Sequence, residues 1–248
     1  MAGGEKRPGA LSLLVGLVDR PAAAVAEVAA DPRLRWVLPV ILLVATMLAS
    51  IVLTSPLTAE QARQAIQQQL AALPADTVEI ARAQIERFQQ PQVLMAAAIG
   101  TGLLGLILSW LVASAILYFG MLIAGGDVNF NGLFATLPWI WLPFALRNAV
   151  QTGWILYRNR LISNPGLSYF VSTGSPTEDA VDLLYNLLGH MDLFGLWHLA
   201  LVFVVLRVLP RFSAGKALVL TLLYAALNLG LRLLPVLLGR SLSLGMVG

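Results

Sequence analysis

The stretch that decides the fold is residues 93–123, VLMAAAIGTGLLGLILSWLVASAILYFGMLI, which contains no charged side chain. A helix needs about 20 mostly apolar residues to cross the hydrocarbon core of a bilayer, which is about 30 Å thick. At about 1.5 Å per residue this run is longer than that thickness, so the helix must tilt or protrude. The run predicts a membrane-spanning helix.

The composition of the whole chain also predicts a membrane protein. Hydrophobic residues make up 58% and charged residues 12% of the 248 residues, and the mean hydropathy is +0.79. A soluble domain of this size could not bury so much apolar surface. The 16 Lys and Arg residues are scattered and form no basic face, so nucleic-acid binding is not expected. The absence of cysteine excludes disulfides, thiolate metal sites and cysteine nucleophiles.

Five apolar runs predict five spans in one all-α domain, residues 1–248, built as a polytopic membrane helical bundle. The runs are residues 36–54, 93–123, 130–157, 193–209 and 217–238. The third is the least regular, because it contains prolines and polar side chains. These are Pro138, Pro143, Arg147, Asn148 and Gln151. We therefore predict that the outer half of this run is kinked, interfacial or turned toward other helices.

Basic residues beside the spans predict the orientation, because Lys and Arg in short flanks favour the cytoplasm. Arg33 and Arg35 precede the first span, and the short segment 207–216 before the last span contains three basic residues. Five crossings then place the N-terminus and this segment in the cytoplasm and the C-terminus outside it. Arg232 and Arg240 argue weakly for the opposite orientation.

The N-terminal residues 11–30 have apolar side chains at helical spacing, interrupted at residues 19–21. This pattern predicts a pair of interfacial helices. A signal peptide is the alternative, since Lys6 and Arg7 precede the apolar patch, but charges interrupt that patch early.

Two further segments predict amphipathic helices outside the cytoplasm. Residues 58–91 predict a helical hairpin, because capping boxes at 58–61 and 76–79 are separated by Pro74. Residues 175–188 predict another helix, capped by its first serine, whose apolar side chains would rest on the membrane or on the hairpin.

Two patterns resemble binding motifs. Gly100, Gly102 and Gly105 form a GxGxxG, but they lie inside an apolar run without the preceding strand of a dinucleotide site, so we interpret them as helix packing. His190, Asp192 and His198 resemble a metal or acid–base cluster. If a helix starts near Asp192, His198 points well round that helix from it, and we expect no shared ligand shell. We predict no catalytic residue, cofactor or metal, and a membrane enzyme is the least favoured class.

Arg147 is the most informative polar residue, since a charge at membrane depth is costly unless it is paired, hydrated or able to snorkel. One hypothesis pairs it with Asp192 or Asp182 as a helix clamp or part of a polar path. The other ends the span near Arg147 and lets its guanidinium reach the interface.

Three other polar residues have plainer interpretations. Asp127 follows two glycines and is predicted to be a solvated turn residue. Asn228 and Arg232 are four residues apart on one helix face and are expected to serve packing or interface anchoring.

A transporter or channel lined by Arg147, Asn148, Gln151 and Asn228 is an alternative function. Five crossings do not divide into the repeated halves expected of a transporter.

Four groups of residues, which together cover nearly the whole chain, carry a family resemblance. They are Pro21 with Asp31-Pro32 and Trp36 to Pro39, then Gly125-Gly126 with Phe130 and Phe134, then Pro143 with Arg147-Asn148, and lastly Asp192-Leu193-Phe194-Gly195-Leu196-Trp197 with Arg211 to Leu218. Each group alone is common in membrane proteins. Their order and spacing resemble the bacterial branch of the Ypt-interacting-protein (YIP) domain family of five-span membrane proteins.

The resemblance implies five spans, a cytoplasmic N-terminus, the bacterial cytoplasmic (inner) membrane and an adaptor role without catalysis. It places Asp192 and Trp197 in a structural motif. Eukaryotic relatives are linked to Rab GTPases through motifs that have no clean counterpart here, and some bacterial relatives look like accessory factors of ABC-type efflux complexes. We therefore expect a scaffold whose partners are the lipid bilayer and other membrane proteins, such as an ABC-type transporter. A homo-oligomer, in which further copies of the chain are the partners, is an additional alternative.

Overall fold

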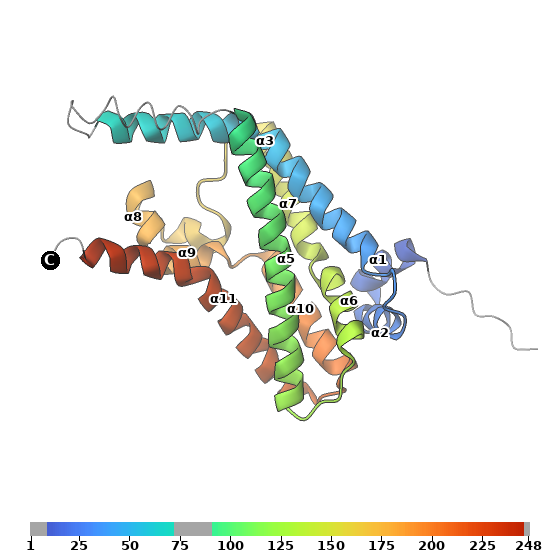
Figure 1. Cartoon of the computed structure of the whole chain (residues 1–248). Coiled ribbons are helices and arrows are strands. Elements are labelled where there is room, and N and C mark those ends of the chain that lie inside the picture. The colour runs from blue at the N-terminus through green and yellow to red at the C-terminus, as the bar shows by residue number, and fades with distance from the viewer. Residues whose placement is uncertain (1–8, 72–90, 246–248) are drawn as a thin grey trace, which may run out of the picture. The chain divides into compact units, whose positions relative to one another are not determined.

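Helices make up the regular structure in the described part of the chain, residues 9–71 and 91–245 of a computed structural model, and no strand occurs there. In chain order (Figure 1) they are α1 Ala10–Asp19, α2 Pro21–Ala30, α3 Val37–Ala71, α5 Pro91–Ile123, α6 Phe130–Ile140, α7 Leu142–Arg158, the 3-10 helix η1 Gly166–Phe170, α8 Pro176–Val181, α9 Leu183–Gly189, α10 Leu193–Val208 and α11 Ala214–Gly245. The all-α prediction is confirmed.

Backbone contacts divide the chain into two compact units, which are described separately. Unit 1 consists of Met1–Leu43, Trp110–Phe144 and Asn164–Gly248, and unit 2 of Val44–Ser109 and Ala145–Ser163. Helices α3, α5 and α7 have residues in both units. The single domain expected from the sequence stays a prediction.

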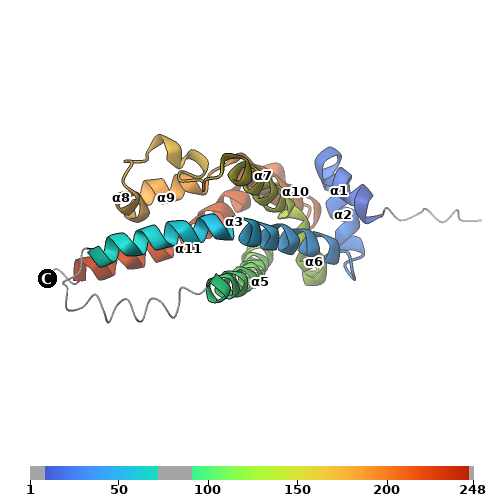
Figure 2. The same cartoon turned by 90° about the horizontal axis from the view of Figure 1, so that it is seen from above.

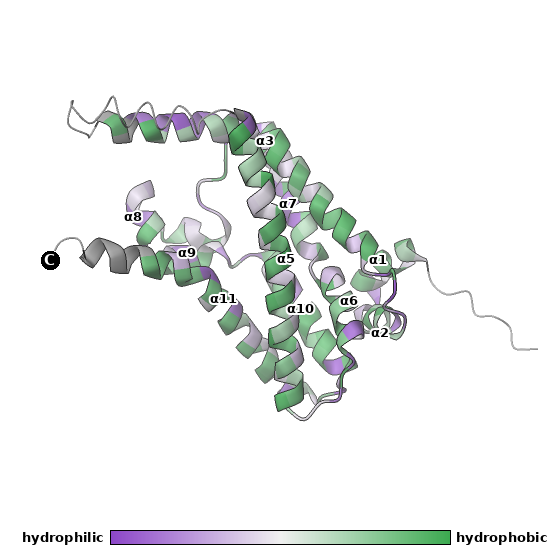
Figure 3. Cartoon of the chain, viewed as in Figure 1, coloured by the Kyte–Doolittle hydropathy of each residue, from purple (hydrophilic) through white to green (hydrophobic). Residues whose placement is uncertain are grey.

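Three helices of the described residues are long and apolar enough to cross a bilayer, over Val37–Gln67, Gln92–Ile123 and Ala214–Leu238. Figure 3 shows these helices as hydrophobic over most of their length. Helices α9 and α10 pass the same test only as a pair bent by 69°, which gives three spans or, if this pair is one span, four. The chain is thus an integral membrane protein, and the count of five spans stays a prediction.

The expected span 130–157 is two helices. Helix α6 has 11 residues and α7 has 17, and Trp141 stands between them. Neither reaches the length of about 20 residues that a bilayer requires. The proline-rich character of this run therefore appears as a break in the helix.

Helix α3 corrects the boundary expected at Thr58, because Val37–Ala71 is one helix with Pro56 inside it. A proline lacks the amide hydrogen that would bond the carbonyl four residues earlier, here that of Val52. The Ser55 hydroxyl donates to this carbonyl at 2.8 Å. The helix therefore bends between its blue and cyan parts without ending (Figure 1), and the Thr58 hydroxyl bonds a carbonyl of the preceding turn at 2.9 Å.

The expected hairpin is described only up to Ala71. Figure 3 shows hydrophilic and hydrophobic residues alternating along the last part of α3, as the predicted apolar stripe requires. The capping box 76–79 and Pro74 lie outside the described residues.

Close helix packing is confirmed for one glycine of the GxGxxG pattern. In unit 2, a Cβ atom placed on Gly102 would lie 3.1 Å from the sulfur of Met47 in α3. The missing side chain thus lets α5 approach α3 closely.

The N-terminal helix pair is confirmed, with Arg20 between α1 and α2, and both views place the two helices side by side (Figures 1 and 2). Helix α2 packs against α6 and α10. A Cβ atom on Gly132 of α6 would lie 3.0 Å from the carbonyl oxygen of Ala29. Helix α1 instead leaves an apolar stripe exposed, Leu11, Val15 and Val18. Within the pair it is therefore α1 that has the uncovered face expected of an interfacial helix.

Trp139 of α6 joins this pair to the start of α3. Its ring packs in a buried cluster with Leu13, Ala24, Val28 and Ala135. Its indole N–H donates to the carbonyl of Arg35 at 3.0 Å, and the Arg35 guanidinium lies 2.9 Å from the Glu27 carboxylate. Arg35, which precedes the first span, is thereby held by contacts with α2 and α6.

Candidate functional site

The break between α6 and α7 is the starting point of a set of hydrogen bonds in unit 1. Pro143 has no amide hydrogen, and the amide of Phe144 bonds the carbonyl of Trp141 at 2.8 Å. A continuous helix would direct the Phe144 amide to the carbonyl of Ile140. The break thus leaves the Ile140 carbonyl without its usual backbone donor.

His198 of α10 supplies the missing donor. Its Nδ1 lies 2.9 Å from the Ile140 carbonyl oxygen, and its Nε2 lies 3.1 Å from the Tyr224 hydroxyl of α11. A carbonyl oxygen only accepts, so Nδ1 carries the hydrogen. Nε2 of the neutral ring then accepts a hydrogen bond from the Tyr224 hydroxyl. The tautomer of His198 follows from these partners.

A third side chain extends this arrangement. The indole of Trp141 hydrogen-bonds the Tyr224 side chain, and an indole N–H can only donate. Hydrogen bonds therefore run in one direction from Trp141 through Tyr224 and His198 to Ile140. We call these four residues the polar chain. Its histidine and tyrosine are 4% and 2% exposed.

The polar chain ties three helices together and has little chemical freedom. Both imidazole nitrogens of His198 are occupied, so neither is open to a metal or a substrate. A proton relay needs members that both accept and donate, whereas the final carbonyl only accepts. The arrangement supports a structural role.

A second set of contacts lies where α10 ends and α11 begins. A Cβ atom on Gly126 would lie 2.7 Å from the Phe212 ring and 2.8 Å from Pro210, so only glycine permits this approach. The Arg207 guanidinium donates to the Phe212 carbonyl at 2.7 Å, and the Lys216 ammonium lies 4.5 Å from the centre of the Phe212 ring. Gly126, which follows Gly125 after α5, is thus in contact with the segment 207–216.

Asp179 organises the segment before α9. Its carboxylate accepts from the Ser172 hydroxyl at 2.5 Å, the Thr173 amide at 2.8 Å and the Thr173 hydroxyl at 3.0 Å. The Ser172 hydroxyl, followed by the Thr173 amide, holds the pKa of Asp179 below its ordinary value.

The helix expected over 175–188 is two helices, which corrects that prediction. Ser175 caps α8 as expected, by accepting from the Glu178 amide at 3.5 Å. Asp182 then interrupts the helix and caps α9, because its carboxylate accepts from the Tyr185 amide at 2.6 Å. An aspartate that bonds the next helix's amide favours a new start over continuation.

Asp192 has the structural role that the resemblance implies. It caps α10 by accepting from the Gly195 amide at 2.7 Å, while His190 caps the end of α9 and His198 belongs to the polar chain. These three residues thus have three separate structural roles, in line with the expectation that they share no ligand shell. Trp197 is half-buried in α10. Among the described residues no group of three or more His, Cys, Asp or Glu could hold a metal ion.

The structure also describes the other predicted polar residues. Asp127 is exposed in the connection after α5, as expected of a turn residue. Asn228 accepts a hydrogen bond from Arg232 at 2.9 Å, which confirms their shared face. Arg147 and Asn148 lie on α7 in unit 2, whereas Asp182 and Asp192 lie in unit 1. The pairing of Arg147 with an aspartate therefore stays a prediction.

The sequence analysis missed Tyr224, Trp141, Phe212 and Asp179. An aromatic residue with a polar atom inside an apolar run is a usable signal, because buried Tyr and Trp usually find a hydrogen-bond partner. The identity of the partner depends on the packing of distant helices.

Comparison with known proteins gives one positive finding. Residues 15–234 match the family model described as the Yip1 domain. Neither the comparison with curated proteins nor that with solved structures gave a match.

Proposed function

Because the chain belongs to the Yip1 domain family, we propose that it is a non-enzymatic membrane scaffold, which binds other membrane proteins through exposed helix faces. The observation that carries this proposal is the surface of α11. In the apolar window of its span Ala214–Leu238, only 17% of the residues are buried. Leu218 and Leu222 lie four residues apart on an exposed face, where a partner helix could pack by van der Waals contact.

The polar chain supports the non-enzymatic part of the proposal. The buried histidine that would be the natural acid–base group is used to close a helix break. Its two ring nitrogens are both hydrogen-bonded, one to the Ile140 carbonyl and one to the Tyr224 hydroxyl.

The partner class that the family resemblance suggests is an ABC-type efflux transporter. A photo-crosslinking residue at position 222 should give one defined adduct in the native membrane, whereas the same residue at the fully buried Val205 should give none. An adduct with a second copy of the chain would identify a homo-oligomer. A chain that forms no adduct and elutes alone in every mild detergent would contradict the scaffold.

The proposed location is the bacterial cytoplasmic membrane, with the N-terminus in the cytoplasm and the C-terminus outside. The chain has no cysteine, so single variants Thr177→Cys and Ser213→Cys report sidedness without background labelling. With a cytoplasmic N-terminus, five spans place residue 177 outside and residue 213 inside. Four spans reverse both positions, and three spans leave both inside.

A small transporter or channel is the second candidate, favoured by the polar face of α7. Arg147, Asn148 and Gln151 lie on one side of this helix. Flux through reconstituted protein that is lost in Arg147→Ala would support a polar path. No flux of any tested ion or lipid would rule this candidate out.

A further inference from the structure

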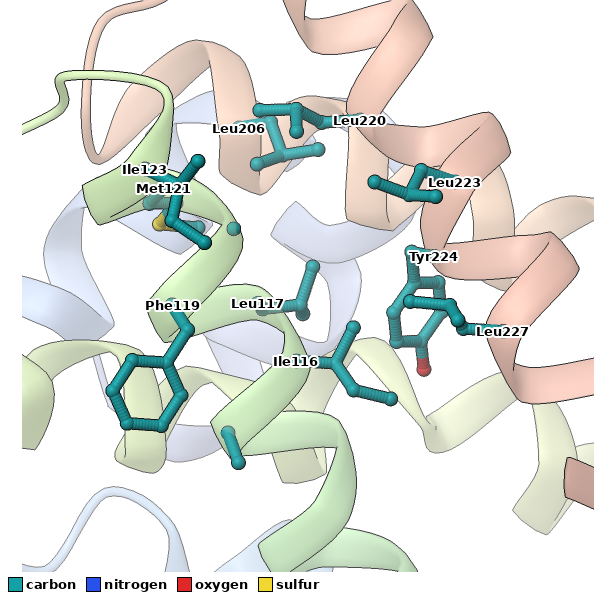
Figure 4. A pocket seen from close by; sticks show the side chains of 12 residues that line it. Ile116, Leu117, Phe119, Met121, Ile123, Leu206, Leu220, Leu223, Tyr224 and Leu227 are labelled. Atoms are coloured by element: carbon teal, nitrogen blue, oxygen red, sulfur yellow. The ribbon is translucent and has the colours of Figure 1, made fainter.

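An apolar groove lies between α5, α10 and α11, with all of its lining residues in unit 1. Its volume is about 330 Å³. Figure 4 shows side chains of α11, among them Leu220, Leu223 and Leu227, turned toward Ile116 and Leu117 of α5. Leu206 of α10 also lines it.

The groove is open along its length. Phe119 and Ile123 of α5 line it and are exposed, as are Leu223 and Leu227 of α11. Both helices are candidate spans. An apolar surface at this depth is covered by hydrocarbon, either a lipid chain or another apolar segment.

One end of the groove is basic. Lys216 precedes Leu220, Leu223 and Leu227 at steps of four, three and four residues, so all four lie on one face of α11. The Lys216 side chain is exposed beside the Phe212 ring.

The charges at this end do not cancel. The connection 124–129 contains one carboxylate, Asp127, and the segment 207–216 contains three cations. Contact between Gly126 and Phe212 brings the two segments together. Arg207 is engaged by the Phe212 carbonyl, while Arg211 and Lys216 are exposed.

The dimensions also match one leaflet of a bilayer. The 11 residue steps from Lys216 to Leu227 give a rise of about 16 Å at about 1.5 Å per residue. Half of a hydrocarbon core of about 30 Å is about 15 Å. A headgroup beside Lys216 would therefore place its acyl chain along the whole groove.

We propose that this groove binds one acyl chain of an anionic glycerophospholipid, whose phosphate is held by Lys216 and Arg211. The apolar lining excludes a polar ligand, and the basic end selects an anionic headgroup over a zwitterionic one. The segment 207–216 is the one predicted to face the cytoplasm, where anionic lipids are enriched. This inference does not depend on the scaffold function.

The test uses the full chain in mild detergent, with phosphatidylglycerol or phosphatidylcholine of identical acyl chains. Native mass spectrometry should show one retained phosphatidylglycerol per chain and weaker retention of phosphatidylcholine. Lys216→Gln and Arg211→Gln should each weaken phosphatidylglycerol binding by about fivefold. Arg20→Gln, which removes an exposed charge between α1 and α2, should leave the affinity unchanged.

A second pair of variants tests the groove itself. Leu223→Trp places a large ring into it and should abolish retention of the lipid. Leu222→Trp is the matched control, because Leu222 is as exposed as Leu223 but does not line the groove. Its behaviour also separates the two proposals, since it alters the proposed partner face and not the lipid site.

Three results would overturn the proposal. Equal retention of both lipids would exclude selection by charge, and retention that survives Leu223→Trp would exclude the groove. A change from two chains to one in Leu223→Trp would show that a second copy fills it.

Discussion

Pro56 and Pro143 each remove an amide from an apolar helix, and the helix responds differently to each. At Pro56 the chain continues as α3, because the Ser55 hydroxyl bonds the carbonyl of Val52 at 2.8 Å. At Pro143 the helix breaks, and the carbonyl of Ile140 is bonded by His198, which is 58 residues away in sequence.

The two sites differ in where the open carbonyl finds its donor. At Pro56 the Ser55 hydroxyl lies one residue away, so the bond is local and α3 bends without ending. At the α6–α7 break the Phe144 amide turns to Trp141, and the Ile140 carbonyl that it leaves takes its donor from α10, which makes the break part of the tertiary structure.

The largest expected effect comes from removing the distant donor. His198→Ala leaves the Ile140 carbonyl without its donor and the Tyr224 hydroxyl without its acceptor, and it creates a cavity, so we expect the free energy of unfolding to fall by about 3 kcal/mol. Titration with SDS in mixed micelles measures it. In His198→Asn the amide can still donate to the carbonyl, and the loss should be smaller. Equal losses in both variants would contradict the role of the donor.

A smaller effect is expected at the other nitrogen of the imidazole. Tyr224→Phe keeps the ring and removes the hydrogen bonds of the hydroxyl with His198 and Trp141, so the free energy of unfolding should fall by about 2 kcal/mol. In the His198→Ala background the same change should cost less, since only the hydrogen bond from Trp141 is then left to lose. Additive costs in this double-mutant cycle would show that the two side chains do not interact.

The local donor should matter less than the distant one. Ser55→Ala removes the bond to Val52, and membrane hydrogen bonds of this kind contribute on average about 0.6 kcal/mol. Pro56→Ala restores the amide, so Ser55→Ala should cost nothing in that background. Ser50→Ala, in the same helix but not before a proline, is the control. A cost of Ser55→Ala that persists without the proline would break the comparison.

The smallest effect concerns Asp179, which lies outside the candidate spans and accepts hydrogen bonds from nearby residues. Its carboxylate can be protonated, unlike a backbone carbonyl. Because hydrogen bonds lower the pKa of Asp179 below its ordinary value of 3.8, their stabilisation is fully present above pH 3.8. It is lost as the pH falls through the lowered pKa. The protection of the Thr173 amide against hydrogen exchange, taken relative to its intrinsic rate at each pH, should therefore fall as the pH drops below 3.8. In Asp179→Asn the exchange should be fast already at neutral pH and show no such acid transition.

The sequence predicts the long elements well, for a physical reason. Spans such as residues 93–123 follow from length and the absence of charge, which need no knowledge of neighbours. The break at residues 19–21 and the caps Ser175 and Asp192 are also readable, because they act within a few residues.

The errors arise where two local signals compete. Thr58 and Gln61 match the pattern of a capping box, but the Thr58 hydroxyl donates to the Thr54 carbonyl and α3 continues through both residues. The polar chain could not be predicted at all, because His198 and Tyr224 are 26 residues apart and meet only when α10 packs on α11. Pro143 signals the break but not the partner that closes it.

The bond between His198 and Ile140 has a consequence for biosynthesis. A ribosome that adds about 5 to 20 residues per second needs on the order of 3 to 12 seconds to make the 58 residues that separate these two partners. During this interval the residues of the α6–α7 break are already synthesised, but the Ile140 carbonyl lacks its final donor. The break can therefore reach its final hydrogen bonding only after α10 has been made.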